Sequence, residues 1–365
     1  MGRIRTRHFI LWISVIVGLM MLASVAMSAE DAWKNPISPQ LAAEGWIALF
    51  DGKTTYGLQA RGDCKWTVAD GALVCGEGTR GRLRTTTEFS GFVLRLQYRL
   101  PADAKAAILH GVQRRGSGRP VSAGSTEIVG KEGGQWQDVE IKGEGARGFI
   151  TIQGTPKLEI RNVLLKPANI KSIFNGKDLR GWKPLVGPNW PSKFSVVDGC
   201  LNIVNGGGDI QTEEQWKDFC CQLDIKSNNE NPKKPLNSGV FFRAEPGKFW
   251  WGYEAQIRNE FSDGDRTKPV DFGTGAIYSR QPARRVVPSE NEWYTMTIVA
   301  AGNHISTWVN GYQATDYTDT NPPGAPREGK CKIEAGAISL QGHDPTTNML
   351  FKNIKVATYP ELKQE

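Results

Sequence analysis

Two strand-like runs within residues 237–259 (NSGVFFRAEPGKFWWGYEAQIRN) hold side chains that could do acid–base chemistry. Side chains alternate between the two faces of a β-strand, so Glu254 and Gln256 are expected on one face. The same alternation places Phe241 and Arg243 together. If the two runs pair, a carboxyl group that moves a proton and a guanidinium that stabilises negative charge would share one surface. The alternative is a surface ion pair between Arg243 and Glu254, which would contribute little to stability.

Two adjacent tryptophans, Trp250 and Trp251, precede the second run. The flat ring of tryptophan can stack on the apolar face of a pyranose sugar. Neighbouring residues of a regular strand point to opposite sides, so both rings cannot enter the same core. One of them is therefore expected at a cleft or in solvent, and packing in the core remains the alternative for the other.

His343 is one of four histidines and follows a strand-like run, AISLQG, that includes Gln341. Gln341 and His343 have the same parity, so both are expected on one face near the strand end. Loops at strand ends build many sites, and imidazole exchanges protons near neutral pH. The alternative is a structural histidine. His110 and His304 carry less signal, and His304 lies in a predicted hairpin turn.

Several catalytic motifs are absent from the sequence: it has no GxSxG, no HExxH and no P-loop. A retaining glycosidase needs two carboxyl groups about 5 Å apart. Beyond Glu254 the next position on that face is Gln256, and Glu260 would lie about 20 Å along an extended strand. A conventional glycosidase would therefore have to recruit its second acid from another strand.

The elements that position these residues are expected to be β-strands. Glycine and proline are frequent, with 41 and 20 residues, and long helical periodicity is hard to find. Two stretches begin alike, WIALFDGK from Trp46 and KSIFNGKD from Lys171, and each leads to a strand pair that turns at Asp-Gly. The similarity indicates one β unit used twice, over 45–168 and 170–360. We predict an all-β chain of two tandem β-sandwiches.

The N-terminus predicts export from the cytoplasm. Arg3, Arg5 and Arg7 precede an apolar run, Phe9–Ala26, and small residues follow it. This is the layout of a secretory signal peptide over residues 1–29, although the run is also about long enough for an uncleaved membrane anchor. We expect a periplasmic or secreted protein with no membrane span after cleavage. Loss of three arginines lowers the net charge from +7 to +4, and no basic, aromatic-rich run indicates nucleic-acid binding.

The six cysteines leave two interpretations open. Cys64 and Cys75 flank a predicted hairpin, so they could form a disulfide or remain buried thiols. No CxxC occurs, and the adjacent pair Cys220–Cys221 lacks the spacing of a zinc site.

The second half of the chain resembles the 3-keto-disaccharide hydrolase family. The resemblance covers 170–358 and is carried, in order, by IFNGKDLRGW, VVDGCL, EEQWKDFCCQLDIK, NSGVFFRA, GYEAQI, GTGAIYS, NEWYTMTIVAAGNHISTWVNG, AISLQGHD and FKNIKV. It extends weakly to 45–168 through LFDGK, the Asp-Gly hairpin and FVLRLQYRL. One departure concerns the residue before His343: the family commonly has an acid there, whereas this chain has Gly342, with Asp344 after the histidine.

The resemblance implies a concanavalin-like jelly roll and cleavage of 3-keto-glycosides by exported proteins. It implies catalytic roles for Glu254, His343 and Arg243, with the substrate bound by Asn237, Trp250, Trp251, Tyr253, Gln256, Tyr278 and Gln341. The first copy lacks the NSG-Arg and GYE-Gln segments and is expected to be non-catalytic.

A ketone at carbon 3 makes the carbon 2 proton acidic, so one base could start elimination of the aglycone, followed by hydration. Glu254 or His343 could be that base, and Arg243 or a divalent metal could stabilise the enolate. The sequence identifies no metal ligands. The alternatives are a non-catalytic carbohydrate-binding or cell-surface module and a conventional endoglucanase.

Overall fold

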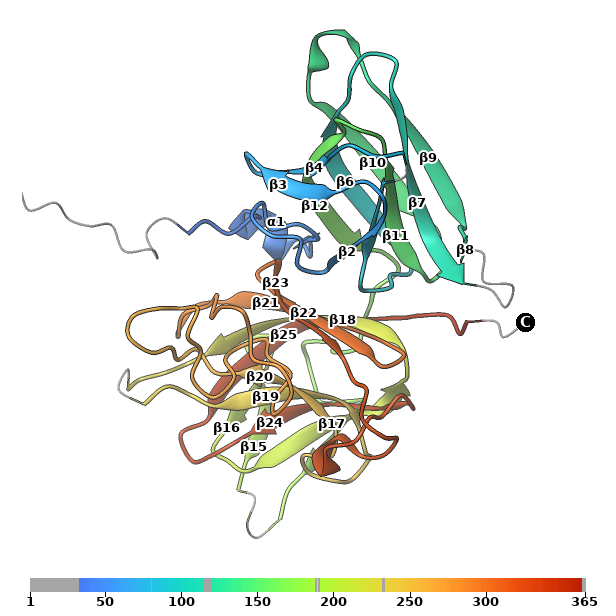
Figure 1. Ribbon diagram of the computed structural model, residues 1–365. Helices are drawn as coiled ribbons and strands as arrows, with labels where there is room; N and C mark the ends of the chain where they lie inside the picture. Colours follow the sequence, from blue (N-terminus) through green and yellow to red (C-terminus); the bar gives the residue numbers. More distant parts are fainter. Residues whose placement is uncertain are drawn as a thin grey trace, which may run out of the picture. The chain divides into compact units, whose positions relative to one another are not determined.

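The protein consists of two tandem β-sandwiches, as predicted (Figure 1). The computed structural model describes residues 33–79, 81–114, 120–187, 189, 191–231 and 234–362. The expected signal peptide, residues 1–29, lies outside this part of the chain. Helices in it are short: α1 (Pro39–Ala43), η1 (Glu132–Gly134) and η2 (Pro326–Glu328). None of the helices in the described ranges is long and apolar enough to cross a membrane.

The first sandwich is formed by two antiparallel sheets. One has the order β10 (Gln137–Gly143), β6 (Phe92–Arg99), β12 (Glu159–Pro167), β4 (Ala72–Cys75) and β3 (Trp66–Ala69), with β1 (Ile47–Ala48) on β12. The other has the order β2 (Leu58–Gly62), β5 (Gly81–Thr85), β11 (Phe149–Gly154), β7 (Lys105–Arg114) and β8 (Pro120–Val121), with β9 (Gly124–Val129) also on β7.

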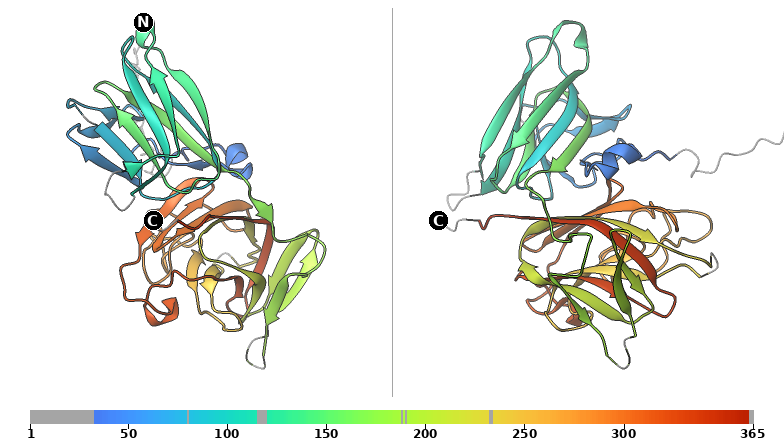
Figure 2. Two further views of the ribbon diagram at one scale, coloured as in Figure 1. Left: turned by 90° about the vertical axis from the view of Figure 1, so that its right-hand side faces the viewer. Right: turned by 180° about the vertical axis from the view of Figure 1, so that it is seen from behind.

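The second sandwich also has two sheets, coloured from yellow-green to red in Figure 2. The larger has the order β15 (Lys193–Val197), β16 (Cys200–Val204), β25 (Asn348–Thr358), β18 (Phe219–Ser227), β21 (Tyr294–Ala301), β22 (His304–Val309) and β23 (Tyr312–Thr318), with β13 (Lys171–Ser172) on β25. The smaller has the order β14 (Trp182–Leu185), β17 (Gly208–Trp216), β24 (Gly336–Gly342), β19 (Ser238–Ala244) and β20 (Tyr253–Ile257).

The Asp-Gly pairs form the tight turns that the sequence predicts. Asp70 and Gly71 connect β3 to β4 with φ of 49° and 73°, and Asp198 and Gly199 connect β15 to β16 with φ of 49° and 76°. Two consecutive positive φ angles match the right-handed twist of the flanking strands. Each turn therefore sets the register of one strand pair at an end of its sheet.

The smaller sheet of the second sandwich is apolar on its inner face. Ile210, Val240, Ala255 and Leu340 come from its four adjacent strands β17, β19, β20 and β24, and all four side chains are fully buried. They pack in one core with residues of the larger sheet such as Phe351. Because side chains alternate, the residues between them face outward, and these outward residues build the site described below.

Arg243 does not follow this alternation, so the prediction that it lies beside Glu254 is wrong. The pairing of β19 with β24 shifts between Phe241 and Ala244, and Arg243 has a left-handed φ of 48°. A bulge of this kind redirects the side chain. The guanidinium is fully buried and donates to Asp218 Oδ1 at 3.0 Å and to three backbone carbonyl groups, those of Lys217, Gly302 and Lys332.

Asp218 is shared by two arginines. Its other oxygen, Oδ2, accepts a hydrogen bond from Arg147 Nη1 at 2.6 Å, and Arg147 Nε donates to Glu88 at 2.5 Å. The backbone N–H of Gly302 also donates to Asp218, at 2.7 Å. Buried charges are tolerated when they are paired and hydrogen-bonded in this way. The sequence motif NSGVFFRA thus includes an arginine with a structural role.

All six cysteines are buried free thiols in the structure. Burial, together with the neighbouring thiol of Cys64, raises the pKa of Cys75 to about 12. Of the two interpretations left open by the sequence, the buried thiol is the one observed.

We expect Arg243→Met to destabilise the fold. The substitution removes one guanidinium from Asp218 and leaves three backbone carbonyl groups without their donor, so the free energy of unfolding should fall by about 3–5 kcal/mol. Urea denaturation followed by circular dichroism measures this change. The matched control is Arg180→Gln, which breaks an exposed ion pair with Asp178 and should cost less than about 1 kcal/mol. Equal losses for the two variants would contradict the structural role of Arg243.

Candidate active site

A pocket of about 110 Å³ lies on the outer face of the smaller sheet of the second sandwich. Its walls come from β19, β20, the end of β24, the loops after β19 and β20, and η2. Nine residues line it: Asn237, Phe241, Trp250, Glu254, Gln256, Tyr278, Arg327, Gln341 and His343. Seven of these are residues that the sequence placed at the site, which leaves Phe241 and Arg327 as additions.

The register of four strands brings the polar residues of the pocket together. Residues paired directly across an antiparallel sheet lie on the same face. One row of directly paired residues crosses β17, β24, β19 and β20 in that order. It consists of Gln211, Ser339, Phe241 and Glu254. The next row consists of Asp209, Gln341, Gly239 and Gln256. Both rows lie on the outer face, directly above the apolar core.

Glu254 lies over a glycine of the neighbouring strand. A Cβ atom on Gly239 would come within 2.3 Å of Glu254 Oε1, so only glycine leaves room for this carboxyl group. Desolvation raises the pKa of Glu254 to about 8, and the nearby carboxyl groups of Asp209 and Asp271 act in the same direction. Arg327 opposes the shift. At neutral pH the side chain of Glu254 is therefore mostly protonated and can donate a proton.

Asp209 is the second perturbed carboxyl group of this sheet. It is fully buried, and desolvation raises its pKa to about 7, opposed by hydrogen bonds from the backbone N–H of Trp250, at 3.4 Å, and from the side chain of Ser339. Asp209 does not line the pocket. It acts on the site through its charge, which disfavours ionisation of Glu254.

Several buried polar atoms around the pocket have no hydrogen-bond partner among the described residues. They are Asn237 Oδ1, Trp250 Nε1 and Gln341 Oε1. Buried polar groups are usually hydrogen-bonded, and each one left without a partner costs about 1–3 kcal/mol. A ligand rich in hydroxyl groups could satisfy those that reach the pocket.

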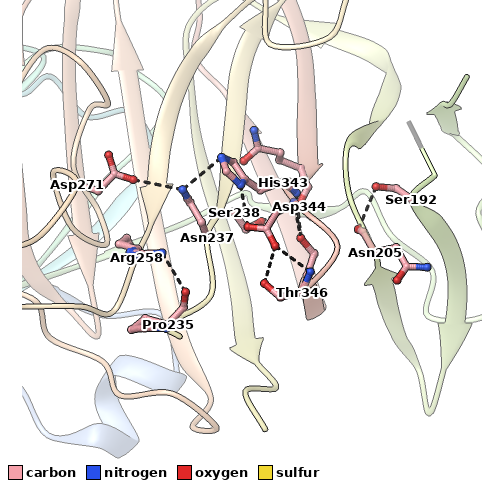
Figure 3. Close-up of polar contacts among 12 residues, drawn as sticks. Ser192, Asn205, Pro235, Asn237, Ser238, Arg258, Asp271, His343, Asp344 and Thr346 are labelled. Carbon is pink, nitrogen blue, oxygen red and sulfur yellow. Dashed lines mark hydrogen bonds and ion pairs between the residues drawn. The ribbon is translucent and has the colours of Figure 1, made fainter. Parts of the chain in front are cut away.

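The imidazole of His343 is held from both sides (Figure 3). Asn237 Nδ2 donates to Asp271 Oδ2 at 3.2 Å and lies 3.3 Å from His343 Nε2. Because a carboxylate only accepts hydrogen bonds, Asp271 orients the amide of Asn237 with its nitrogen toward the histidine. Nε2 is therefore the acceptor, and Nδ1, which is 3.1 Å from Asp344 Oδ2, carries the proton.

Asp344 supplies the carboxylate that the resemblance places before the histidine. Burial alone would raise the pKa of Asp344, but hydrogen bonds from Thr346 and His343 outweigh it and lower the pKa. A side chain at position 342 has no space, since a Cβ atom on Gly342 would lie 2.2 Å from Ser192 Oγ and 2.9 Å from Asn205 O. In this chain the acid that contacts the ring is therefore the residue after His343.

Aromatic rings and one cation form the outer wall of the pocket. The ring of Trp250 stacks on Phe249 with 4.3 Å between centroids, and lies 6.3 Å from the ring of His343 at an interplanar angle of 27°. The guanidinium of Arg327 lies 5.4 Å from the Trp250 ring. Tyr278, which is 38% exposed, stands at the rim. The wall offers a stacking surface and a positive charge to a bound sugar.

Three predicted site residues do not line the pocket. Arg243 is buried in its own network. Tyr253 lies on the inner face of β20, where it stacks on Phe242 and donates to Asp319 Oδ2 at 2.6 Å. Trp251 packs under Lys248, whose Nζ is 4.3 Å from the ring, so of the two tryptophans only Trp250 reaches the pocket.

Four residues at or near the site were not identified by the sequence analysis, and only two of them carry a sequence signal that could have indicated their position. Asp209 and Gln211 flank Ile210 in an alternating run, so parity could have placed them on the outer face. Arg327 belongs to the three-residue helix η2, which is too short to give a periodic signal, and Asp271 reaches the site through a connection after β20. Gln256 Nε2 donates to Asp271 Oδ2 at 3.2 Å, which holds that connection against the sheet.

The possible divalent metal finds no cluster of ligands in the structure. Within the described ranges, no group of three or more His, Cys, Asp or Glu side chains is arranged to hold an ion.

Comparison with known proteins identifies the family. The model of the 3-keto-alpha-glucoside-1,2-lyase-like domain matches residues 45–128 and 169–357. A 3-keto-disaccharide hydrolase of Bacteroides thetaiotaomicron is 25% identical over 125 residues, which cover 32% of this chain and 41% of the relative. The chain thus spans less than half the length of this curated relative.

Two solved structures cover about half of the chain. A Parabacteroides distasonis protein, provisionally named a glycosyl hydrolase, is 22% identical over 52% of this chain and 94% of its own, with a TM-score of 0.41. The carbohydrate-binding module CBM66 of Bacillus subtilis is 16% identical over 48% of this chain and 96% of its own, with a TM-score of 0.36. The family match covers most of the sequence, so the chain belongs to the family defined by the 3-keto-alpha-glucoside-1,2-lyase-like domain.

Proposed function

We propose that the second sandwich cleaves the glycosidic bond of a 3-keto-glycoside by eliminating the aglycone and then adding water. The family match and the curated relative support a glycoside-hydrolase-like or carbohydrate-binding function in general. The narrower proposal is supported by one feature of the pocket, which is that Glu254 is the single carboxylic acid among the described residues that line it.

A single carboxyl group fits elimination better than direct hydrolysis. Direct hydrolysis with retention or inversion requires two carboxyl groups at the reacting carbon. Asp209 and Asp271 lie near enough to shift the pKa of Glu254, but Asp209 is fully buried and Asp271 is held by Asn237 and Gln256. Neither lines the pocket, so neither takes the part of the second carboxyl group at the substrate.

The side chains divide the elimination between them. His343 Nε2, which accepts from Asn237 in the structure, exchanges that partner for the carbon 2 proton and removes it, and the electron pair of that C–H bond moves to form an enolate with the carbon 3 ketone. Collapse of the enolate breaks the bond between carbon 1 and the glycosidic oxygen. The protonated Glu254 gives its proton to this oxygen as the aglycone leaves. Water then adds to carbon 1 of the resulting enone, while carbon 2 regains a proton, so the net reaction is hydrolysis.

Arg327 would stabilise the enolate, the role that the sequence analysis expected of Arg243. It is the one cation among the described residues lining the pocket apart from the titratable His343, and its charge acts on Glu254. A guanidinium there would stabilise the negative oxygen of the enolate. Trp250 offers its ring to the apolar face of the sugar, and Gln256 and Gln341 offer amide groups to its hydroxyls.

A non-catalytic carbohydrate-binding module is the second candidate, favoured by the unpaired polar atoms and the stacked aromatic wall. Such a module has no need for a carboxyl group with a raised pKa beside a base-competent imidazole.

We further propose that the chain works in the periplasm or outside the cell, on the basis of the signal-like layout of residues 1–29. The six buried thiols are shielded there from oxidation.

The pH dependence of cleavage tests the role of Glu254. As a general acid with a pKa of about 8 it must be protonated, so kcat/KM for a 3-keto-glycoside should fall as pH rises through about 8. Glu254→Gln should lower kcat by about 10²–10⁴-fold and remove this decline. The control Glu213→Gln changes an exposed acid of β17 and should leave the profile unaltered. A rate that instead rises through pH 8 would make Glu254 the base.

Isotope exchange separates the first proton transfer from the departure of the aglycone. In heavy water, cleavage should place deuterium at carbon 2 of the sugar product, faster than in a sample without enzyme. His343→Gln should abolish this exchange, whereas Glu254→Gln should still exchange the carbon 2 proton of uncleaved substrate, because it loses only the later step. Equal cleavage of the unoxidised glycoside would reject the elimination route, since its carbon 2 proton is not acidic.

A further inference from the structure

The sheet of the first sandwich that contains β2, β5, β11, β7 and β9 repeats the strand order of the sheet that carries the candidate site. The order β2-β5-β11-β7-β9 corresponds to β14-β17-β24-β19-β20. The register also agrees, because Gly81 pairs with Gly154 as Gly208 pairs with Gly342. Positions of the two outer faces can therefore be matched one by one.

Two of the matched pairs keep the hydrogen-bonding character of the site. Gln153 stands where the second sandwich has Gln341, and Thr151 where it has Ser339. The acids are lost. The position of Asp209 is occupied by Arg82.

Farther across the sheet, the position of Glu254 is occupied by Ser125, which reaches its place by pairing with Leu109 of β7. The first sandwich thus has a polar outer face without the carboxyl group proposed to donate a proton.

Three arginines gather on this face, and one of them, Arg82, stands at the position of an acid. A cavity of about 260 Å³ is lined by Arg61, Arg82 and Arg84, and its described lining includes no Asp or Glu. Arg61 and Arg82 are exposed and directly opposite each other on paired strands, an arrangement of like charges that destabilises a sheet. On the same sheet, Glu127 of β9 forms an ion pair with Lys105 at 3.0 Å.

Part of the cationic face is already held in place. Arg84 lies over the ring of Phe149, with 4.1 Å between its guanidinium carbon and the ring centroid, and donates to Gln59 Oε1 at 3.1 Å. The same oxygen of Gln59 accepts from Arg61 at 2.9 Å. Two guanidinium groups are thus fixed side by side before any ligand arrives, which reduces the entropy lost on binding.

We propose that this groove binds an acidic oligosaccharide, a chain of sugar units bearing carboxylate groups, and does not cleave it. Arginine presents a planar fork of donors that matches a carboxylate. The amides of Gln113 and Gln153 can bond sugar hydroxyls, and the apolar side chains of Leu109, Val112 and Val121 can cover the C–H faces of the rings. The proposal is independent of catalysis in the second sandwich.

Calorimetric titration of the whole chain with a tetramer of galacturonic acid tests the proposal, beside the same tetramer with its carboxylates masked as methyl esters. We expect the acid form to bind at least about ten-fold more tightly than the ester, because charge-assisted hydrogen bonds are lost on masking. Arg82→Gln and Arg61→Gln should each weaken binding of the acid form by about ten-fold. Both arginines are exposed and lie opposite each other, so each variant should unfold at the temperature of the parent chain or slightly above it.

Arg180→Gln is the matched control, because it removes one exposed positive charge from the second sandwich and should leave binding unchanged. Three results would overturn the proposal: no binding of the acid tetramer at millimolar concentration, equal binding of the methyl ester, or an equal loss of affinity in the control variant. The last would mean that the tetramer responds only to net charge.

Discussion

The alternation of side chains across the sheet β14-β17-β24-β19-β20 is the constraint on which the second sandwich and its site both depend. Ile210, Leu340 and Val240 fill the core, and the residues between them face the pocket. A slip of one residue would exchange the two faces and bury the polar set. The packing that stabilises the sandwich therefore also selects which functional groups meet on its outer face.

The protonation of Glu254 and His343 depends on the groups that surround them in the folded chain. The pKa of Glu254 is raised because the sheet shields its carboxyl group from water and places Asp209 and Asp271 nearby. The tautomer of His343 is set by Asp344 and the amide of Asn237, which determine the ring nitrogen that carries the proton. Because each partner sits on a different strand or loop, no short sequence motif contains the whole arrangement.

How much of this could be read from the sequence follows from the same physics. Period-2 alternation placed Glu254, Gln256, Gln341 and His343 correctly, and Asp-Gly predicted both hairpins, because these features depend on neighbouring residues alone. Arg243 was misplaced, since the bulge that turns it inward comes from pairing with a strand about 95 residues away. Arg327 lies in the three-residue helix η2, and only the folded chain brings it to the pocket.

The buried polar atoms without a protein partner around the pocket limit how the sequence can change. A substitution that replaces one of them, or the carboxyl group of Glu254, by an apolar group of similar shape removes a cost of burial. Stability and binding would therefore favour different residues at these positions. Ser125, at the position that matches Glu254, has no carboxyl group to bury. The two matched faces thus differ in how much stability their polar groups cost.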